Sequence, residues 1–151
     1  MDTLDKISEI YIDALSEVIT KVTGISFNVS SRQSENSFDE ITGAMYLNGK
    51  KNGMLFVTAK EPDVRVICSS MIGVPPSDVS KDEIDDTMCE LVNMTAGSAK
   101  LRLGNTDYMF SLLQPFVIKG RYVSIVTKSI TRVESGVLTN GEITVRIKLI
   151  Y

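Results

Sequence analysis

The order of its periodic segments constrains the fold of this 151-residue chain more than any single motif does. Helical patterns alternate with two groups of strand-like patterns: helix 4–23, strands 25–30, 41–47 and 53–59, helices 60–73 and 80–103, then strands 108–113, 117–118, 122–128 and 142–150. Two groups of strands around two adjacent helices favour an α+β fold. We expect a mostly antiparallel sheet packed with two long helices and one shorter helix, in a single domain over residues 1–151.

Local signals mark the ends of several of these segments. Ser80-Lys-Asp-Glu83 is a capping-box pattern for the helix that follows it. Pro62 suits the first turn of the shorter helix. Asn48-Gly49 and Asn140-Gly141 are turn signals, which predict a hairpin over 41–59 and a turn before the last strand.

Composition excludes several classes of protein. Hydrophobic residues make up 43% of the chain and charged residues 23%, as in ordinary globular proteins. The net charge is -3 with no basic cluster, so we expect no nucleic-acid partner. Apolar runs such as Met54–Val57 are too short to cross a bilayer, and the first residues lack the basic and apolar regions of a signal peptide. The expectation is a cytoplasmic protein with no membrane partner.

The chain contains no histidine, and this removes most familiar catalytic sites. A histidine general base, a Ser-His-Asp triad and a Cys-His nucleophile are all excluded, as are zinc sites built on imidazole. The two cysteines, Cys68 and Cys89, fall in predicted helices and are interpreted as packing residues. An enzyme built on this chain must work with carboxylates, amides, lysines or the groups of a partner.

A stripe of polar residues runs along the predicted helix 80–103. Spacings of 4, 3, 4 and 3 place its members on one helix face, and we call this set the polar stripe: Asp86, Glu90, Asn93, Gly97 and Lys100. An acid, an amide and a bare glycine are poor core material and suit a surface that another polar surface approaches. The opposite face, which we expect to be buried, carries Ile84, Met88, Leu91, Thr95 and Ala99.

A solvated helix face is the simpler interpretation of part of this pattern. Carboxylates in the first two turns favour the helix dipole, which accounts for Asp82, Glu83, Asp85 and Asp86 as solvated capping charges. Glu90 and Asn93 lie beyond these turns, so the dipole does not explain them. Spacing alone leaves a functional role for this pair open.

The segment from Asp86 to Lys100 resembles the signature helix of the CheC/CheX/FliY phosphatases of bacterial chemotaxis. The family pattern is an acid, three residues, Glu-x-x-Asn, then a glycine four residues on, often followed by Asn-Ala-Lys. The matching positions are Asp86, Glu90, Asn93, Gly97, Ala99 and Lys100, whereas Ser98 stands where the family usually has asparagine.

The likeness covers most of residues 40–130. Residues 51–73 resemble the strand-then-helix unit of the family, and 111–120 resemble its Ser-Leu-Pro-x-Val-x-x-Gly strand with looser spacing. The single Glu-x-x-Asn copy points to a CheX-like protein, because members of the CheC branch usually carry two.

The resemblance implies hydrolysis of the aspartyl phosphate of a CheY-type response regulator. In that reading Asn93 orients the attacking water and Glu90 forms a salt bridge with the regulator's active-site lysine. Asp86 and Gly97 contact the partner, although packing of Gly97 against a strand of its own domain is nearly as good an explanation. Mg²⁺ is supplied by the response regulator, and the chain needs no cofactor of its own.

Two other interpretations stay open. The same helix could dock a response regulator without catalysis, as in a flagellar-switch-like scaffold module. Alternatively, the methionines Met71, Met88 and Met94 could line a ligand pocket, although methionines at these spacings usually belong to the core. The resemblance also implies a homodimer with a sheet shared between subunits, and the alternating strand 141–151 is a candidate edge for that pairing.

Overall fold

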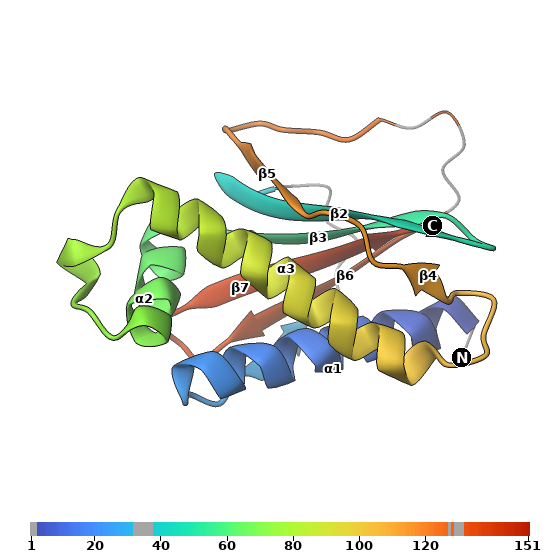
Figure 1. Cartoon of the computed structure of the whole chain (residues 1–151), viewed down its shortest axis with the longest axis horizontal. Helices are drawn as coiled ribbons and strands as arrows, with labels where there is room; N and C mark the ends of the chain where they lie inside the picture. The colour runs from blue at the N-terminus through green and yellow to red at the C-terminus, as the bar shows by residue number, and fades with distance from the viewer. Residues whose placement is uncertain (1–2, 32–37, 127, 129–131) are drawn as a thin grey trace.

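The computed structural model describes residues 3–31, 38–126, 128 and 132–151. The helices are α1 (Thr3–Thr23), α2 (Glu61–Ile72) and α3 (Lys81–Leu103), with a short 3-10 turn, η1 (Pro76–Asp78), before α3. Within the described residues, α1 and α3 lie against one face of a seven-stranded sheet, and α2 packs against both of them at one end of the sheet (Figure 1). The strands are β1 (Asn28–Ser31), β2 (Ile41–Gly49), β3 (Gly53–Ala59), β4 (Phe110–Ser111), β5 (Phe116–Lys119), β6 (Val133–Thr139) and β7 (Thr144–Ile150).

The strand order is β1-β6-β7-β3-β2-β4, with β5 also paired to β2, and every pair is antiparallel. The α+β fold with a mostly antiparallel sheet, two long helices and one shorter helix is therefore confirmed. The predicted hairpin over 41–59 is present, with Gly43 opposite Val57 in register.

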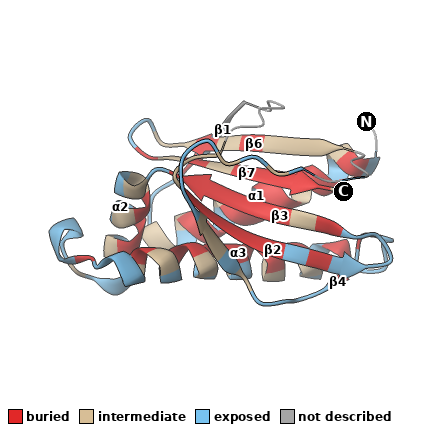
Figure 2. Ribbon diagram, turned by 90° about the horizontal axis from the view of Figure 1, so that it is seen from above, coloured by how far each residue is buried: buried red, intermediate tan, exposed pale blue. Residues whose placement is uncertain are grey.

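Alternation along the strands separates two apolar clusters. Met45, Leu55 and Leu149 lie in one cross-strand row and belong to the main core beneath the helices. Their neighbours Ala44, Phe56 and Ile150 form a smaller cluster on the other face, where the ring of Phe38 packs edge-on against Phe56 at 5.3 Å. Figure 2 shows how continuous the buried positions are along β2, β3 and β7. The sheet is thus apolar on both faces, with the helices covering only one.

The predicted helices and caps are confirmed. Ser80 accepts a hydrogen bond from the backbone of Glu83, and Glu83 reaches back to the Ser80 backbone, which completes the capping box of α3. Pro62 lies in the first turn of α2, and Gly73 ends that helix in the left-handed conformation at φ 73°. No described helix is both long and apolar enough to span a bilayer.

Two strand predictions in the C-terminal part were inaccurate or wrong, and one strand was not predicted. The strand expected at 108–113 is only Phe110–Ser111, and none of the described residues of 122–128 is in a strand. Gly120 at φ 148° and Tyr122 at φ 61° interrupt the extended backbone after β5, and the described residues that follow pair with no strand. Strand β6 was missed altogether.

The C-terminal strand is not an edge strand, which corrects the pairing suggested for it. Strand β7 lies between β6 and β3 and is hydrogen-bonded on both sides. Strand β1 ends the sheet on one side, and β4 and β5 end it on the other. A sheet shared between two subunits could not be built through β7.

Candidate functional site

The polar stripe lies on the outward face of α3. Asp86, Glu90 and Asn93 are exposed, whereas Gly97 and Lys100 are half-buried. Among the described residues, none forms a side-chain hydrogen bond or ion pair with Glu90 or Asn93. At about 1.5 Å of rise per residue, these two side chains leave the helix about 4.5 Å apart along its axis. An unengaged carboxylate and an unengaged amide therefore stand side by side, ready to contact another molecule.

The inward face of α3 holds this surface in place. All five residues predicted to be buried there are at most 1% exposed, namely Ile84, Met88, Leu91, Thr95 and Ala99. Full burial of one Ile, Met or Leu side chain stabilises the fold by about 1.5–3 kcal/mol. An exposed asparagine within a helix costs only about 0.7 kcal/mol. The core contacts therefore outweigh the poor helix propensity of the stripe, and the outward face is free to carry functional groups.

Strand β2 approaches α3 closely through Gly43. A Cβ at position 43 would lie 2.7 Å from Cγ2 of Val92 and 2.8 Å from the backbone oxygen of Met88. Only a glycine allows the helix backbone to come this near to the strand. Gly43 thus sets the distance between α3 and the sheet. The sequence pattern did not predict this role.

An ion pair fixes the start of α3 against the sheet edge. Lys119 on β5 donates to Asp85 at 2.6 Å, and the other carboxylate oxygen of Asp85 is buried without a hydrogen-bond partner among the described residues. Asp85 is therefore not a solvated capping charge, which corrects the interpretation given to it above. No local pattern predicts the pairing, because β5 reaches α3 only through the sheet topology.

Gly97 faces open space. A Cβ added there would meet no atom within 4 Å. The alternative that Gly97 packs against a strand of its own domain is therefore wrong. The helix surface is bare at this position, and an approaching molecule could touch its backbone.

Cys68 and the three methionines behave as packing residues, whereas Cys89 is only partly buried. Cys68 is buried and its thiol donates to the backbone oxygen of Glu83 at 3.6 Å. Partial burial, with Asp86, Asp85 and Glu90 nearby, raises the pKa of the Cys89 thiol, so Cys89 stays protonated at neutral pH and is a poor nucleophile. Met88 is fully buried, and the other two methionines of the proposed pocket pack against the main core: Met71 and Met94.

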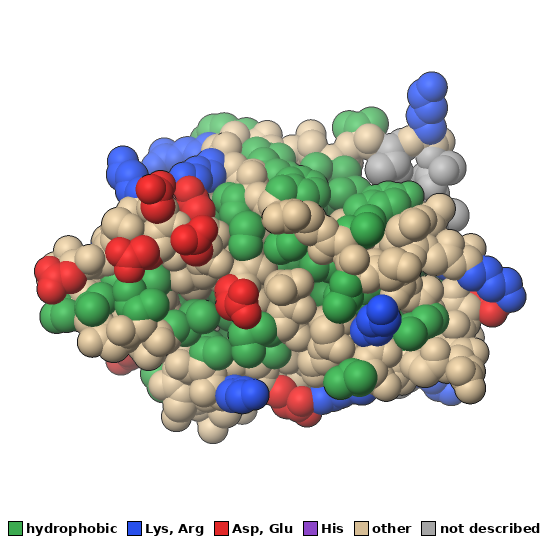
Figure 3. Space-filling view, in the orientation of Figure 1, with side chains coloured by type: hydrophobic (Ala, Val, Ile, Leu, Met, Phe, Trp, Pro, Cys, Tyr) green, Lys and Arg blue, Asp and Glu red, His purple; other side chains and the backbone are tan. Residues whose placement is uncertain are grey.

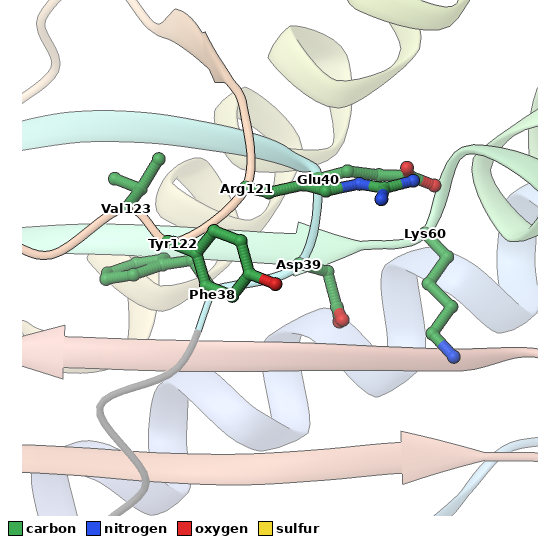
Figure 4. Close-up of a pocket in the computed structure, with 7 residues that line it drawn as sticks. All are labelled: Phe38, Asp39, Glu40, Lys60, Arg121, Tyr122 and Val123. Carbon is green, nitrogen blue, oxygen red and sulfur yellow. The ribbon is translucent and has the colours of Figure 1, made fainter.

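One cavity lies away from the polar stripe. It has a volume of about 510 Å³ and lies on the sheet face opposite the helices, where Phe38 packs against Phe56. Figure 4 shows the side chains around it: Phe38, Asp39, Glu40, Lys60, Arg121, Tyr122 and Val123. Both acids are already used in the fold, since Asp39 pairs with Arg146 at 2.7 Å and Glu40 accepts a hydrogen bond from the backbone of Glu61 at 2.7 Å. This cavity does not share residues with the polar stripe.

No metal site is evident in the part of the chain that the structure describes. Three or more His, Cys, Asp or Glu side chains do not come together there in an arrangement that could hold an ion. The acids near the start of α3 are instead divided among the capping box, the pair with Lys119 and solvent.

Known structures share this fold over nearly the whole chain. The chemotaxis protein CheX from Vibrio vulnificus superposes with a TM-score of 0.82 at 18% identity, covering 96% of this chain and 98% of that one. A CheC-like superfamily protein from Shewanella sp. PV-4 gives 0.84 at 21% identity, covering 99% and 98%. The CheX of a CheX–CheY–BeF3–Mg²⁺ complex from Borrelia burgdorferi gives 0.76 at 15% identity, covering 94% and 95%.

Comparison of sequences assigns the chain to a family. No curated protein matches it. The family model described as chemotaxis phosphatase CheX matches residues 41–135, a stretch that includes β2, β3, α2 and the entire polar stripe. The chain therefore belongs to the CheX family.

Proposed function

We propose that this protein accelerates hydrolysis of the aspartyl phosphate of a CheY-type response regulator. The observation that carries the proposal is the pair Glu90 and Asn93, exposed and unengaged one turn apart on a helix whose other face is locked into the core. Membership of the CheX family supports the reaction. The Borrelia CheX structure, solved with CheY, supports the choice of partner.

Asn93 is proposed to orient the attacking water. Phosphoryl transfer depends mainly on positioning and electrostatics, because the protein has little covalent chemistry to perform. A neutral amide is not repelled by the phosphoryl oxygens, and it can both donate to and accept from a water molecule. The exposed Asn93 side chain forms no hydrogen bond with any described residue, so it is available for this task.

Glu90 is proposed to bind the lysine of the response-regulator active site. A carboxylate beside a phosphoryl group would be repelled unless it meets a cation, and a charge-assisted hydrogen bond to lysine supplies one. Asp86 lies one turn before Glu90 and adds a second negative charge to the same surface. The bare backbone at Gly97 would let the partner approach closely. Mg²⁺ is expected to be held by the response regulator, so this chain contributes no metal ligand.

The test is the rate of phosphate release from a panel of CheY-type response regulators charged with acetyl phosphate. Asn93→Ala should return the rate to that of spontaneous hydrolysis while binding to the beryllofluoride-charged regulator stays largely intact. Glu90→Ala should weaken both binding and rate. Full activity of the Asn93 variant would contradict the proposed role of Asn93 in orienting the water. Unchanged affinity of the Glu90 variant would argue against the salt bridge.

Matched controls come from an exposed carboxylate and an exposed amide elsewhere in the chain. Asp13 is exposed on α1 and Asn105 is exposed beyond the end of α3. Asp13→Ala and Asn105→Ala should leave both rate and affinity unchanged. If the wild-type chain binds a phosphorylated regulator without accelerating its hydrolysis, the non-catalytic docking module is the better description.

A homodimer is proposed as well. Tyr122 is 99% exposed and Val126 is 88% exposed, in a segment that is rich in β-branched residues but pairs with no strand in the described chain. Pairing with a second copy would bury these side chains and satisfy the backbone. Light scattering at micromolar concentration should give the mass of a dimer, and a Tyr122→Lys, Val126→Lys double variant should give a monomer. A monomeric wild-type chain would refute the dimer.

A further inference from the structure

Leu101 is an apolar side chain on the functional face of α3. It is 87% exposed, whereas Ala99 and Leu103 on either side of it are fully buried. A single exposed leucine is common on proteins and by itself implies nothing. The position of Leu101 relative to the polar stripe is what gives it meaning.

The helix geometry places Leu101 in line with Glu90 and Gly97. At about 100° per residue, Leu101 lies about 20° from Glu90 around the helix axis and about 40° from Gly97. Lys100, the last member of the polar stripe, lies further round the helix. Along about 16 Å of axis, the face therefore presents an acid, an amide, a bare backbone and then an exposed leucine.

Nothing in the fold requires leucine at this position. Lysine, glutamine and glutamate have nearly the same helix propensity as leucine, and the last turn of a helix favours basic residues. Its neighbours Lys100 and Arg102 follow that preference, and Arg102 forms an ion pair with Glu17 on α1. An exposed leucine between two basic residues adds no core contact, which leaves its side chain available for contact with another molecule.

A second set of exposed apolar residues passes beside this end of α3. Residues 109–113 lead from the end of α3 through β4 towards β5, alongside the helix (Figures 1 and 2). Met109 is 39% exposed, Leu112 is 46% exposed and Leu113 is 40% exposed. The space-filling view shows hydrophobic side chains gathered on the surface in this region, whereas acidic side chains gather near the other end of α3 (Figure 3). The face is thus acidic at one end and apolar at the other.

We propose that Leu101 is the apolar anchor of the response-regulator interface and sets its affinity. This inference rests on the proposed function, because the occupant is the receiver domain that brings its lysine to Glu90. With the lysine fixed at Glu90 and the partner backbone close to Gly97, the receiver surface continues across Leu101. We expect an apolar depression on that surface opposite Leu101, which lies about 16 Å along the helix axis from Glu90. The charged residues set the orientation of the partner. Leu101 adds apolar contact area, which is exposed to water again when the partner dissociates.

The experiment separates affinity from chemistry. Leu101→Gln in the full chain should raise KM for the phosphorylated regulator about tenfold and leave kcat unchanged, because burial of one leucine contributes about that factor and Asn93 is untouched. Affinity for the beryllofluoride-charged regulator should fall by the same factor. Ile72→Gln is the matched control, since Ile72 is 46% exposed at the end of α2, and it should change neither constant. Circular dichroism should give the same thermal midpoint for both variants and the wild type.

The other outcomes distinguish failure of the Leu101 anchor from failure of the proposed phosphatase activity. Unchanged KM and affinity in Leu101→Gln, with wild-type acceleration present, would overturn the anchor and leave the phosphatase standing. A shift from dimer to monomer with unchanged KM would assign Leu101 to a second copy of this chain and also overturn it. A wild-type chain that binds the charged regulator without accelerating hydrolysis would refute the proposed phosphatase activity. Comparison of the affinities of the wild type and Leu101→Gln would still show whether Leu101 is the anchor.

Discussion

Gly43 on β2 and Met88 on α3 approach each other so closely that a Cβ at position 43 would lie 2.8 Å from the Met88 backbone oxygen. The contact joins β2, near the start of that strand, to the helix that carries Glu90 and Asn93. It lies on the buried side of α3, only a turn from the proposed catalytic pair. Gly43, which has no side chain, packs against the buried side of α3. The position of Glu90 and Asn93 on the exposed side of the helix therefore depends on Gly43.

Gly43→Ala should destabilise the fold and impair catalysis together. The added methyl group must push a backbone oxygen rather than a flexible side chain, so we expect a loss of about 1–3 kcal/mol in the free energy of unfolding. Urea denaturation measures this loss. A variant with unchanged stability would show that α3 can shift without cost.

Gly97→Ala should have the opposite effect on stability. The new methyl group meets no atom within 4 Å, and alanine is favoured over glycine within a helix by about 1 kcal/mol. We expect the thermal midpoint to rise while affinity for the charged regulator falls, because the partner backbone loses its bare contact surface. A more stable variant with undiminished affinity would remove Gly97 from the interface.

Asn93→Asp should be at least as damaging as Asn93→Ala. The two side chains have the same shape, but the carboxylate cannot donate to water and it repels the phosphoryl oxygens. We expect phosphate release at the spontaneous rate, together with weaker binding of the beryllofluoride-charged regulator. Retained acceleration would mean that the group at position 93 works as an acceptor only.

Cys89 should report the negative charge of the polar stripe. Because burial and the nearby carboxylates of Asp86, Asp85 and Glu90 raise the pKa of its thiol, its thiolate forms at higher pH than that of an ordinary cysteine. We expect Asp86→Asn to lower that pKa and to speed the reaction of Cys89 with a disulfide reagent at pH 8. The Cys89→Ser variant gives the background from buried Cys68. Equal rates in wild type and Asp86→Asn would contradict the coupling.

The ion pair between Asp85 and Lys119 should be weak but measurable. Lys119 is 51% exposed and Asp85 is 28% exposed, and solvent screening limits pairs of this kind to about 0.2–1 kcal/mol. A double-mutant cycle with Asp85→Asn and Lys119→Met should give a coupling energy in that range, smaller at 1 M salt. A coupling energy of zero would leave β5 held only by its pairing with β2.

The sequence was sufficient for the features that depend on local chemistry. The capping box of Ser80 and Glu83 requires only four consecutive residues, and the two faces of α3 follow from its helical period. Strand β6 was missed because its helix-facing position 136 is glycine, where a Cβ would lie 2.9 Å from Ile12 on α1. Position 136 accommodates α1, a helix that is distant in the sequence but close in the fold. A glycine there weakens the apolar pattern from which a strand would be predicted.

At 122–128 the error was the opposite one: a strand was predicted, and the described residues form none. The β-branched and aromatic residues there are typical of a strand, but a strand needs a neighbour, and the described part of the chain places none beside it. The ion pair of Asp85 with Lys119, the close approach at Gly43 and the exposure of Leu101 were likewise out of reach. Each depends on which segments the topology brings together rather than on residues near in sequence.

The central position of β7 has a consequence for the order in which the fold forms during synthesis. The hairpin of β2 and β3 can form as soon as it leaves the ribosome, but the second edge of β3 stays unpaired until residues 144–150 have been made. Pairing of segments so far apart in the chain is slow, because the intervening loop must first be closed. The nascent chain therefore carries an open, apolar strand edge through most of its translation, and that edge is where a chaperone would be needed.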